Sequence, residues 1–183
     1  MPHLRAMAKG KDIWIEKGYE VFALHGASGL KVEALAKALD ISKSSFYHHF
    51  ADMEIFISYL IAHHLQRCEI IAVKETNAKN IDPELIDVLV EFKLDLLFNR
   101  QLRFSRNNIE YSQAIQKTDA MVGNAFVMLW VKELNLNFSP EKIAALFELA
   151  LENFYLQINL DNLHQGWLSE YFSNLKRLAK SME

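Results

Sequence analysis

Apolar residues recur at intervals of three and four along most of this chain, and the residues that interrupt helices are sparse. The 183 residues include only six glycines and three prolines, and alternating β-branched and polar residues are hard to find. Between Asp12 and His25 the helical spacing is clear, and Gly26 and Gly29 end it. The sequence therefore predicts an all-α protein.

Two short helices joined by a tight turn are expected between residues 32 and 50. The first carries one apolar stripe over about two turns, made of Val32, Leu35, Ala36 and Leu39. The second is predicted over 43–50, with the Ser42 hydroxyl accepting the backbone N–H of the third helical residue. A helix that starts three or four residues after another must cross it steeply, as in a helix-turn-helix.

The second short helix has two distinct sides. Phe46 and Phe50 are four residues apart and are expected to face inward with Ile41. The opposite side is polar or amphipathic and carries Lys43, Ser44, Tyr47 and His48. Such side chains offer donors for phosphates, hydroxyls for base edges and an aromatic ring for a thymine methyl group. We interpret this helix as a DNA-reading element, with a solvated surface helix as the alternative.

Longer helices are expected in the rest of the chain. Asp82 before Pro83 and Ser139 before Pro140 have the pattern of a capping residue followed by a first-turn proline. The region 101–117 is less regular than its neighbours. The predicted long helices span 54–74, 84–98, 119–134 and 140–160.

Charge and cysteine content exclude some classes of protein. The formal net charge of -3 is unlike that of a strongly basic nucleic-acid-binding domain, but no carboxylate lies between Asp40 and Asp52. Cys68 is the single cysteine, so an intrachain disulfide is excluded. No apolar run reaches the roughly 18 residues of a membrane span, and the start lacks the apolar core of a secretory signal. We expect a cytoplasmic protein without a membrane partner.

The segment 14–57 resembles the N-terminal domain of the TetR family of transcriptional regulators. The resemblance is carried by IEKGYEVFALHG, by VEALAKALDISKSSFYHHF and by the ADMEIF that follows, about a quarter of the chain. It implies a three-helix helix-turn-helix DNA-binding domain over 1–52 and a helical effector-binding and dimerisation domain over 53–183. It further implies a ligand-responsive repressor, not an enzyme, that acts as a homodimer on a palindromic double-stranded DNA operator and needs no cofactor.

The resemblance also implies which residues contact DNA. Lys43, Ser44 and Ser45 would lie near base edges and backbone, Tyr47 and His48 near phosphates and a thymine methyl group, and His49 between the inward and outward rows. Two positions depart from the family pattern. Leu30 and Lys31 stand where the family often has Thr or Ser, so Lys31 is expected to take that phosphate, and Met53 replaces a common Lys. The expected DNA-binding residues are Lys31, Lys43, Ser44, Ser45, Tyr47, His48 and His49.

The region 140–160 is apolar on two sides, whereas a helix with one side in solvent normally carries a single apolar side. One stripe consists of Ile143, Phe147, Phe154 and Ile158, and the other of Ala145, Leu149, Leu156 and Leu160. We expect one stripe to face the protein's own core and the other a second copy, with a monomer that buries both as the alternative. The predicted dimer interface comprises Leu149, Leu156, Leu160, Leu168, Phe172 and Leu175.

Aromatic and amide residues between these regions suggest a ligand pocket, although an aromatic cluster is more often core. The candidate pocket residues are Phe92, Leu96, Phe104, Asn107, Tyr111, Phe126 and Trp130. The small-molecule effector is not identified by the sequence. Arg100, Arg103 and Arg106 would suit an anionic ligand or a solvated face. His64 and Cys68 are four residues apart, but two ligands do not make a metal site, so no metal is expected.

Two other classes of function remain open at this point. A helical enzyme is one, but no Gly-rich phosphate loop, metal-ligand cluster or Ser/His/Asp order is found. The other is a helical protein-interaction scaffold that has lost DNA binding. The electrically neutral segment 1–54, with seven basic and seven acidic residues, and Met53 favour that scaffold.

Overall fold

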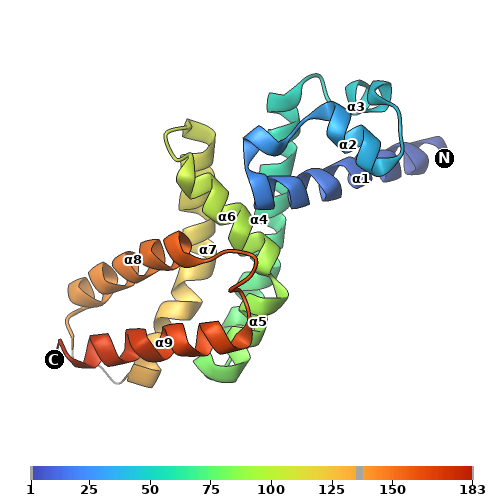
Figure 1. The fold of residues 1–183 in the computed structure, drawn as a ribbon. Helices are drawn as coiled ribbons and strands as arrows, with labels where there is room; N and C mark the ends of the chain where they lie inside the picture. Colours follow the sequence, from blue (N-terminus) through green and yellow to red (C-terminus); the bar gives the residue numbers. More distant parts are fainter. Residues whose placement is uncertain (1, 135–137, 183) are drawn as a thin grey trace.

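The computed structural model describes residues 2–134 and 138–182, with the side chains of residues 2–9, 123–126 and 134 left out of the description. All regular elements of the described residues are helical, which agrees with the predicted all-α class (Figure 1). They are α1 (Pro2–His25), η1 (Ala27–Gly29), α2 (Val32–Leu39), α3 (Lys43–His49), α4 (Met53–Asn77), η2 (Ile81–Leu85), α5 (Ile86–Glu91), α6 (Lys93–Phe104), α7 (Ile109–Leu134), α8 (Pro140–Gln157) and α9 (Gln165–Lys180).

Helices α1 to α3 group together at one end of the molecule, and we call this group the head (Figure 1). Its core contains Trp14, Phe22, Leu35, Phe46 and Phe50, each at most 1% exposed. The tight turn between α2 and α3 passes through Asp40, whose φ of 55° and ψ of 43° are left-handed. Aspartate tolerates this conformation better than most residues, so the turn predicted after residue 39 forms as expected.

Helix α4 runs from the head into the rest of the molecule (Figure 1). The Asp52 side chain caps its first turn by accepting from the Ile55 amide at 2.8 Å. Near its start, α4 lies so close to α1 that a Cβ atom on Gly18 would be 2.3 Å from Cζ of Phe56. Glycine at position 18 therefore allows the two helices to approach.

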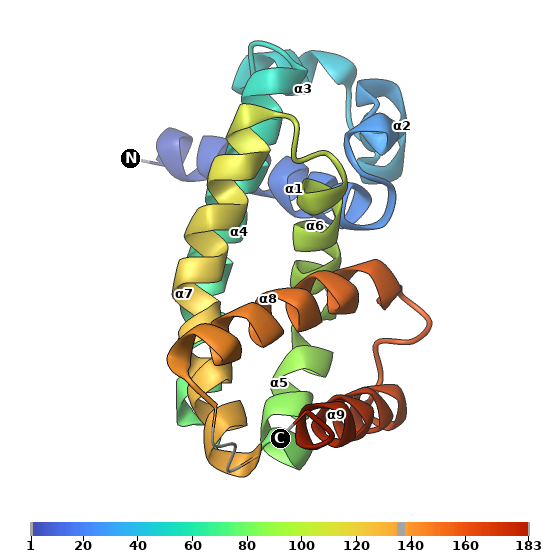
Figure 2. The same cartoon turned by 90° about the vertical axis from the view of Figure 1, so that its left-hand side faces the viewer.

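Helices α5 to α9 form the second part, which we call the body. Helix α7 runs alongside α4, and α6 lies beneath α1, so the body contacts the head through α6 (Figures 1 and 2). Helices α8 and α9 meet through aromatic side chains, with the Phe154 and Tyr171 ring centroids 5.5 Å apart. The body is therefore a layered helical bundle attached to the head by α4 and α6.

Several predicted boundaries differ from the structure. The predicted helix 84–98 is broken, because Phe92 has a φ of −102° and a ψ of 29° between α5 and α6. Helix α8 ends at Gln157 and not at residue 160. The uncertain region 101–117 contains the end of α6 and the start of α7.

The two predicted proline-linked caps have different outcomes. The Ser139 cap is confirmed, since its hydroxyl accepts from the Lys142 amide at 3.4 Å. The Asp82 cap is wrong: Asn80 Oδ1 accepts from the Glu84 amide at 3.0 Å, and the Asp82 carboxylate accepts a hydrogen bond from Ser169 of α9. The Asp82 carboxylate, which the local pattern predicted to cap the helix, is therefore engaged in a tertiary contact with α9.

Candidate nucleic-acid interface and ligand cavity

Helix α3 is held in the head by two phenylalanines. Phe46 is 0% exposed and meets Trp14 edge-to-face, with ring centroids 5.3 Å apart. Phe50 is 1% exposed, and its ring centroid lies 4.7 Å from that of Phe56 at the start of α4. The predicted inward side of α3 is confirmed, and the rigid aromatic packing fixes the direction in which the opposite side points.

The opposite side is exposed, as the spacing predicts. Tyr47 is 61% exposed, a high value for a large aromatic side chain. We call this surface the outer face of α3; it consists of Lys43, Ser44, Tyr47 and His48, all exposed. An exposed row of donors and one amphipathic ring on a short, firmly packed helix has the chemistry needed to read a DNA groove.

The serines at the start of α3 are arranged differently from the prediction. The Ser42 hydroxyl makes no capping bond and instead bonds the Ser44 hydroxyl at 2.8 Å. Ser45 is half-buried, and its hydroxyl accepts from Trp14 Nε1 at 3.4 Å. Ser45 therefore faces α1, and a direct contact of its hydroxyl with a base does not fit this placement. Ser44 remains on the outer face.

Lys43 forms an ion pair within the head. Its Nζ lies 3.1 Å from Oε1 of Glu33 on α2, and the two side chains are 57% and 70% exposed. An exposed ion pair of this kind contributes little to stability. Lys43 is therefore available to a phosphate, although it must leave Glu33 to reach one.

The remaining expected contacts lie at the edges of the head. Lys31 is exposed directly before α2. His49 is half-buried, and burial, followed by the nearby charges of His48 and Lys11, lowers its pKa. Met53 packs against the head core, so it offers no phosphate contact at the start of α4. The DNA contacts of Lys31, Lys43, Ser44, Tyr47, His48 and His49 remain predictions.

A buried polar network joins the head to α4 and α6. The Tyr19 hydroxyl of α1 donates to Asp95 Oδ1 at 2.7 Å and lies 2.7 Å from His64 Nδ1. Arg67 pairs with both carboxylate oxygens of Asp95, through its Nε and through its Nη2 at 2.7 Å. The ring of Phe98 stacks on Tyr19 at 4.5 Å. The sequence pattern did not identify this network, because its members come from three helices.

Burial governs the protonation of this network. Desolvation, followed by the charge of Asp95, raises the pKa of Tyr19. Desolvation lowers the pKa of His64 to about 4, so its ring is neutral at pH 7. The hydrogen bond to Asp95 is the main cause that raises the pKa of Arg67, so the guanidinium group stays charged.

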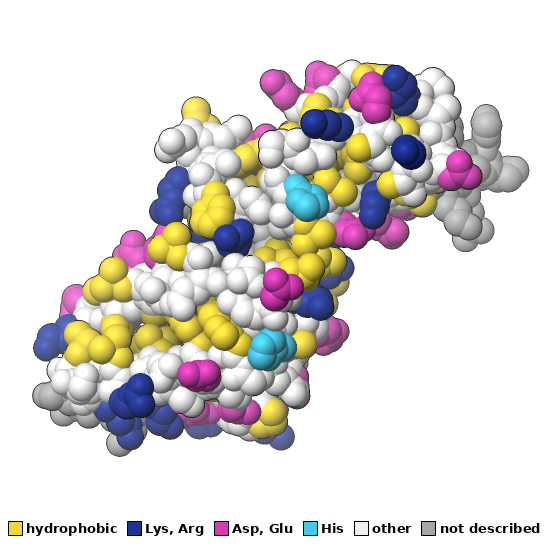
Figure 3. Space-filling model, in the orientation of Figure 1, with side chains coloured by type: hydrophobic (Ala, Val, Ile, Leu, Met, Phe, Trp, Pro, Cys, Tyr) yellow, Lys and Arg dark blue, Asp and Glu magenta, His cyan; other side chains and the backbone are white. Residues whose placement is uncertain are grey.

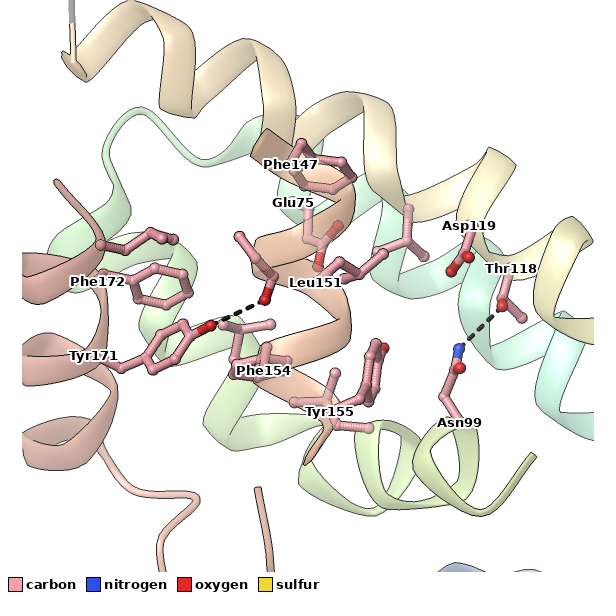
Figure 4. A pocket seen from close by; sticks show the side chains of 15 residues that line it. Glu75, Asn99, Thr118, Asp119, Phe147, Leu151, Phe154, Tyr155, Tyr171 and Phe172 are labelled. Atoms are coloured by element: carbon pink, nitrogen blue, oxygen red, sulfur yellow. Dashed lines mark hydrogen bonds between the residues drawn. The ribbon is translucent and has the colours of Figure 1, made fainter. Parts of the chain in front are cut away.

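A cavity of about 70 Å³ lies within the body, between residues of α4 to α9 (Figure 4). This is room for several water molecules. It is lined by Glu75, Leu89, Leu96, Asn99, Thr118, Asp119, Val122, Phe147, Ala150, Leu151, Phe154, Tyr155, Tyr171, Phe172 and Leu175.

Of the six predicted pocket residues whose side chains are described, one, Leu96, lines this cavity. Phe92 is buried beneath the cations of Arg67 and Lys74, and Tyr111 packs edge-to-face on Phe22 in the core. Trp130 is 1% exposed, Phe104 is 51% exposed and Asn107 is exposed. The side chain of Phe126 lies outside the described residues. The ligand contacts expected of these residues remain predictions, and the cavity itself is lined mostly by residues of α8 and α9.

Polar groups occur at a few points of the cavity wall. Asn99 Nδ2 donates to Thr118 Oγ1 at 3.0 Å (Figure 4). Asp119 pairs with Arg103, which is 5% exposed and also bonds Glu152 at 2.5 Å. Of the three arginines considered for an anionic ligand, Arg103 is thus committed to carboxylates. Arg106 also bonds Glu152, at 2.6 Å, and Arg100 stacks on the Phe104 ring.

The residues expected at the dimer interface fall into two groups. Leu149, Leu156 and Leu160 are 70%, 66% and 45% exposed, and we call them the exposed leucine stripe. Leu168 and Phe172 are 0% and 7% exposed, so they belong to the core of the body and cannot face a partner. Leu175 is half-buried and lines the cavity. Figure 3 shows hydrophobic side chains gathered along α8 and α9 on one face of the body.

The described residues provide neither a metal site nor a membrane-spanning helix. No group of three or more His, Cys, Asp or Glu side chains suited to a metal ion occurs among the described residues. The candidate pair His64 and Cys68 is buried in the polar network, with Cys68 Sγ 3.7 Å from His64 Nε2. No helix within residues 2–134 and 138–182 is long and apolar enough to cross a membrane.

Comparison with known proteins agrees with this geometry. Residues 15–58, which contain most of the head and the start of α4, match the family model described as bacterial regulatory proteins, tetR family. The chain is 24% identical over 131 residues to the biofilm operon icaADBC HTH-type negative transcriptional regulator IcaR of Staphylococcus aureus. This match covers 72% of the chain and spans 66% of the length of that relative.

Two solved structures share the fold over nearly the whole chain. One is a transcriptional regulator (TerR/AcrR family) from Aquifex aeolicus VF5, with a TM-score of 0.58, 20% identity and coverage of 95% of this chain and 99% of the other. The second is a putative TetR-family transcriptional regulator from Rhodococcus sp., with a TM-score of 0.54, 16% identity and coverage of 94% and 99%. The fold of the body is therefore also found in these regulators.

Proposed function

We propose that this chain, a member of the TetR family of bacterial regulatory proteins, is a ligand-responsive repressor that binds a palindromic operator as a homodimer. The outer face of α3 is the observation that carries this proposal. It is polar, exposed and free of carboxylates, and it is fixed from beneath by Phe46 and Phe50. The functional division that we propose is DNA binding by 1–52 and effector binding with dimerisation by 53–183, in the cytoplasm.

The exposed leucine stripe supports the homodimer. Three leucines on and just beyond α8 are exposed while Phe154 and Ile158 of the same region are buried. This is the division between a core-facing and a partner-facing stripe that two apolar sides predict. Two copies joined through this stripe would carry two α3 helices, and a palindromic site needs such a pair about 34 Å apart.

The polar network and the cavity support a response to a ligand. The network fixes α1 of the head against α4 and α6, while Leu96 and Asn99 of α6 line the cavity. A ligand that alters the position of α6 would therefore act on the helix that holds the head. Repression would end because two heads moved out of the operator spacing bind it more weakly.

DNA binding is tested with the full chain and DNA from upstream of its own gene. A gel shift at two salt concentrations is expected to show specific binding that weakens steeply as salt rises, because phosphate contacts release counterions. The Tyr47→Ala variant, which removes an exposed ring and leaves Phe46 and Phe50 in place, is expected to lose discrimination between this DNA and a scrambled sequence. Absence of specific binding by the folded wild-type chain would favour the protein-interaction scaffold.

A further inference from the structure

The cavity of the body contains a carboxyl group, that of Glu75, with one oxygen that has no partner among the described residues. Glu75, near the end of α4, is 3% exposed, and its Oε2 atom has no hydrogen-bond partner among the described residues. We propose that this cavity binds a small hydrophobic amine or another small organic cation, which Glu75 recognises. The inference rests on the proposed function, because it gives the chemical class of the effector.

A buried carboxyl group without a partner is costly, and such groups are rare in folded proteins. Among the described residues that line the cavity there is no Lys or Arg. Arg103, which contacts the lining residue Asp119, already pairs with Asp119 and Glu152. A cation supplied by a ligand would therefore meet an unused acceptor, whereas a ligand carboxylate would meet Glu75 and Asp119 without a free positive charge.

The walls of the cavity suit the apolar part of such a ligand. Five aromatic side chains line it, namely Phe147, Phe154, Tyr155, Tyr171 and Phe172. Figure 4 shows Glu75 beside Phe147 and Leu151, with the Tyr171 and Phe172 rings across from it. Aromatic faces attract organic cations through the ring quadrupole, and this attraction adds to that of a carboxylate. The volume of about 70 Å³ favours a ligand smaller than one aromatic ring, since a benzene-binding cavity is about 150 Å³.

Proton binding by Glu75 gives the inference a distinct signature. Burial raises the pKa of Glu75 to about 8, so at neutral pH the carboxyl of the empty cavity is largely protonated. A permanent cation must displace that proton, and its affinity should increase as pH rises toward 8.

The other titratable groups around Glu75 are not expected to produce this dependence of cation affinity on pH. Burial raises the pKa of Cys68 and of Tyr171 to about 12, and it raises that of Tyr155 as well. Burial also raises the pKa of Asp119, while Arg103, its ion-pair partner, lowers it. Glu75 is therefore the group facing the cavity that is expected to change charge between pH 6 and 8.

Isothermal titration calorimetry on the full chain tests the inference with tetramethylammonium, a small cation whose charge does not depend on pH, and with acetate as the small anionic probe. We expect the cation to bind at least tenfold more tightly than acetate at pH 8. Its affinity should rise about tenfold or more from pH 6 to pH 8, since each pH unit below a group's pKa corresponds to about a tenfold change in its ionised fraction.

Two variants separate Glu75 from the general charge of the protein. Glu75→Gln keeps the shape of the side chain and is expected to lose tenfold or more in cation affinity and all of the pH dependence. Glu148→Gln, on the exposed side of α8, should bind as the wild type does. Circular dichroism confirms that each variant is folded. The inference is overturned by tighter binding of acetate, by no binding of the cation to the folded wild type, or by unchanged binding to Glu75→Gln.

A gel shift with and without tetramethylammonium keeps the two proposals apart. Release of operator DNA by the cation in the wild type, but not in Glu75→Gln, supports both. Calorimetric binding that depends on Glu75 supports the cation site even when the chain binds no DNA. Operator binding without any cation binding retains the repressor and overturns the cation site.

Discussion

Single side chains in this protein have roles that their surroundings decide. Lys43 and Glu75 illustrate this at opposite ends of the molecule. Lys43 is exposed and can exchange Glu33 for a phosphate, whereas Glu75 is enclosed and its Oε2 atom has no partner among the described residues. Replacing Lys43 should therefore alter DNA binding with little effect on stability, whereas replacing Glu75 should alter stability as well as ligand binding.

Replacing Lys43 by Ala is expected to weaken operator binding on all sequences and to reduce the slope of log affinity against log salt by about 1, because one phosphate contact is lost. Glu33→Gln is expected to strengthen operator binding, since it removes a carboxylate that competes with DNA for Lys43. Fluorescence anisotropy at several salt concentrations measures both. Lys176→Ala, an equal charge change on α9, is the control, and an unchanged slope for Lys43→Ala would contradict the contact.

Glu75 is expected to make stability depend on pH. Its pKa is about 8 in the folded state against an ordinary value of 4.5, so the folded state holds the proton more tightly. The stabilisation from this proton is fully present below pH 4.5 and is lost as pH rises through 8. Relative to wild type, Glu75→Gln should therefore gain unfolding free energy with rising pH, up to about 5 kcal/mol between pH 4.5 and 8.

Urea unfolding of both proteins at pH 5, 7 and 9 measures this difference. Glu148→Gln, whose carboxylate is exposed in both states, should show no such trend. A difference between Glu75→Gln and wild type that is the same at all three pH values would mean that Glu75 is ionised in the folded protein.

At the scale of elements, the contacts of α1 determine how the head is attached. Helix α1 meets α4 at Gly18 and meets α4 and α6 through the Tyr19 hydroxyl. Adjacent residues thus provide a close backbone approach and a polar connection. Substitutions at these positions should change the fit between helices rather than the helices themselves.

Gly18→Ala is expected to destabilise the protein by about 1–3 kcal/mol, the usual cost of overpacking. The new Cβ would lie 2.3 Å from Cζ of Phe56, a ring that is 0% exposed and has no space to move into. This cost exceeds the gain of roughly 1 kcal/mol that alanine gives in a helix. Gly166→Ala in α9 is the control. Its Cβ would have no atom closer than 3.5 Å, so thermal unfolding should show increased stability for this variant.

Asp95→Asn is expected to cost about 2–4 kcal/mol of unfolding free energy. It removes the charge that pairs with Arg67, and a buried ion pair that loses one partner leaves the other uncompensated. The estimate is below the full cost for a buried pair, because Arg67 is 35% exposed. Chemical denaturation measures the change, with Asp161→Asn on an exposed loop as the control. Equal stability of the two variants would mean that the polar network does not help to hold the head in place.

At the scale of the whole molecule, the distribution of exposed apolar groups is uneven. The exposed leucine stripe lies on the body, far from the outer face of α3 (Figures 1 and 3). Leu178 and Met182, 54% and 57% exposed near the end of the chain, add to the apolar surface of α9. Separation of the two surfaces allows DNA binding and self-association to occur together.

The double variant Leu149→Glu and Leu156→Glu is expected to be monomeric and folded, because four charges buried in a symmetric interface would repel one another. Light scattering after size-exclusion chromatography gives the mass, and operator affinity should fall by at least tenfold when the two heads are no longer joined. Val73→Glu, at a position 62% exposed on α4, is the control. A dimeric double variant would place the interface elsewhere.

The division between what the sequence predicted and what it missed follows the range of the interactions. The short helix pair, the buried Phe46 and Phe50 and the exposed Tyr47 follow from spacing alone, because neighbours three or four residues apart share a helix face. The Asp82 cap was wrong because Ser169, 87 residues later, uses that side chain. A local pattern has no information about such a competitor.

The sequence by itself determined the all-α class, the head and the stripe on α8 that stays exposed, since each depends on residues close together in the chain. Only the tertiary structure decided where the cavity lies, that Leu168 and Phe172 are core, and that Glu75, Tyr19 and Asp95 are buried. Burial depends on which helices pack against a residue, and that packing is set by contacts between segments far apart in the sequence. Glu75 shows this most plainly, because its unsatisfied carboxyl exists only where several helices enclose it.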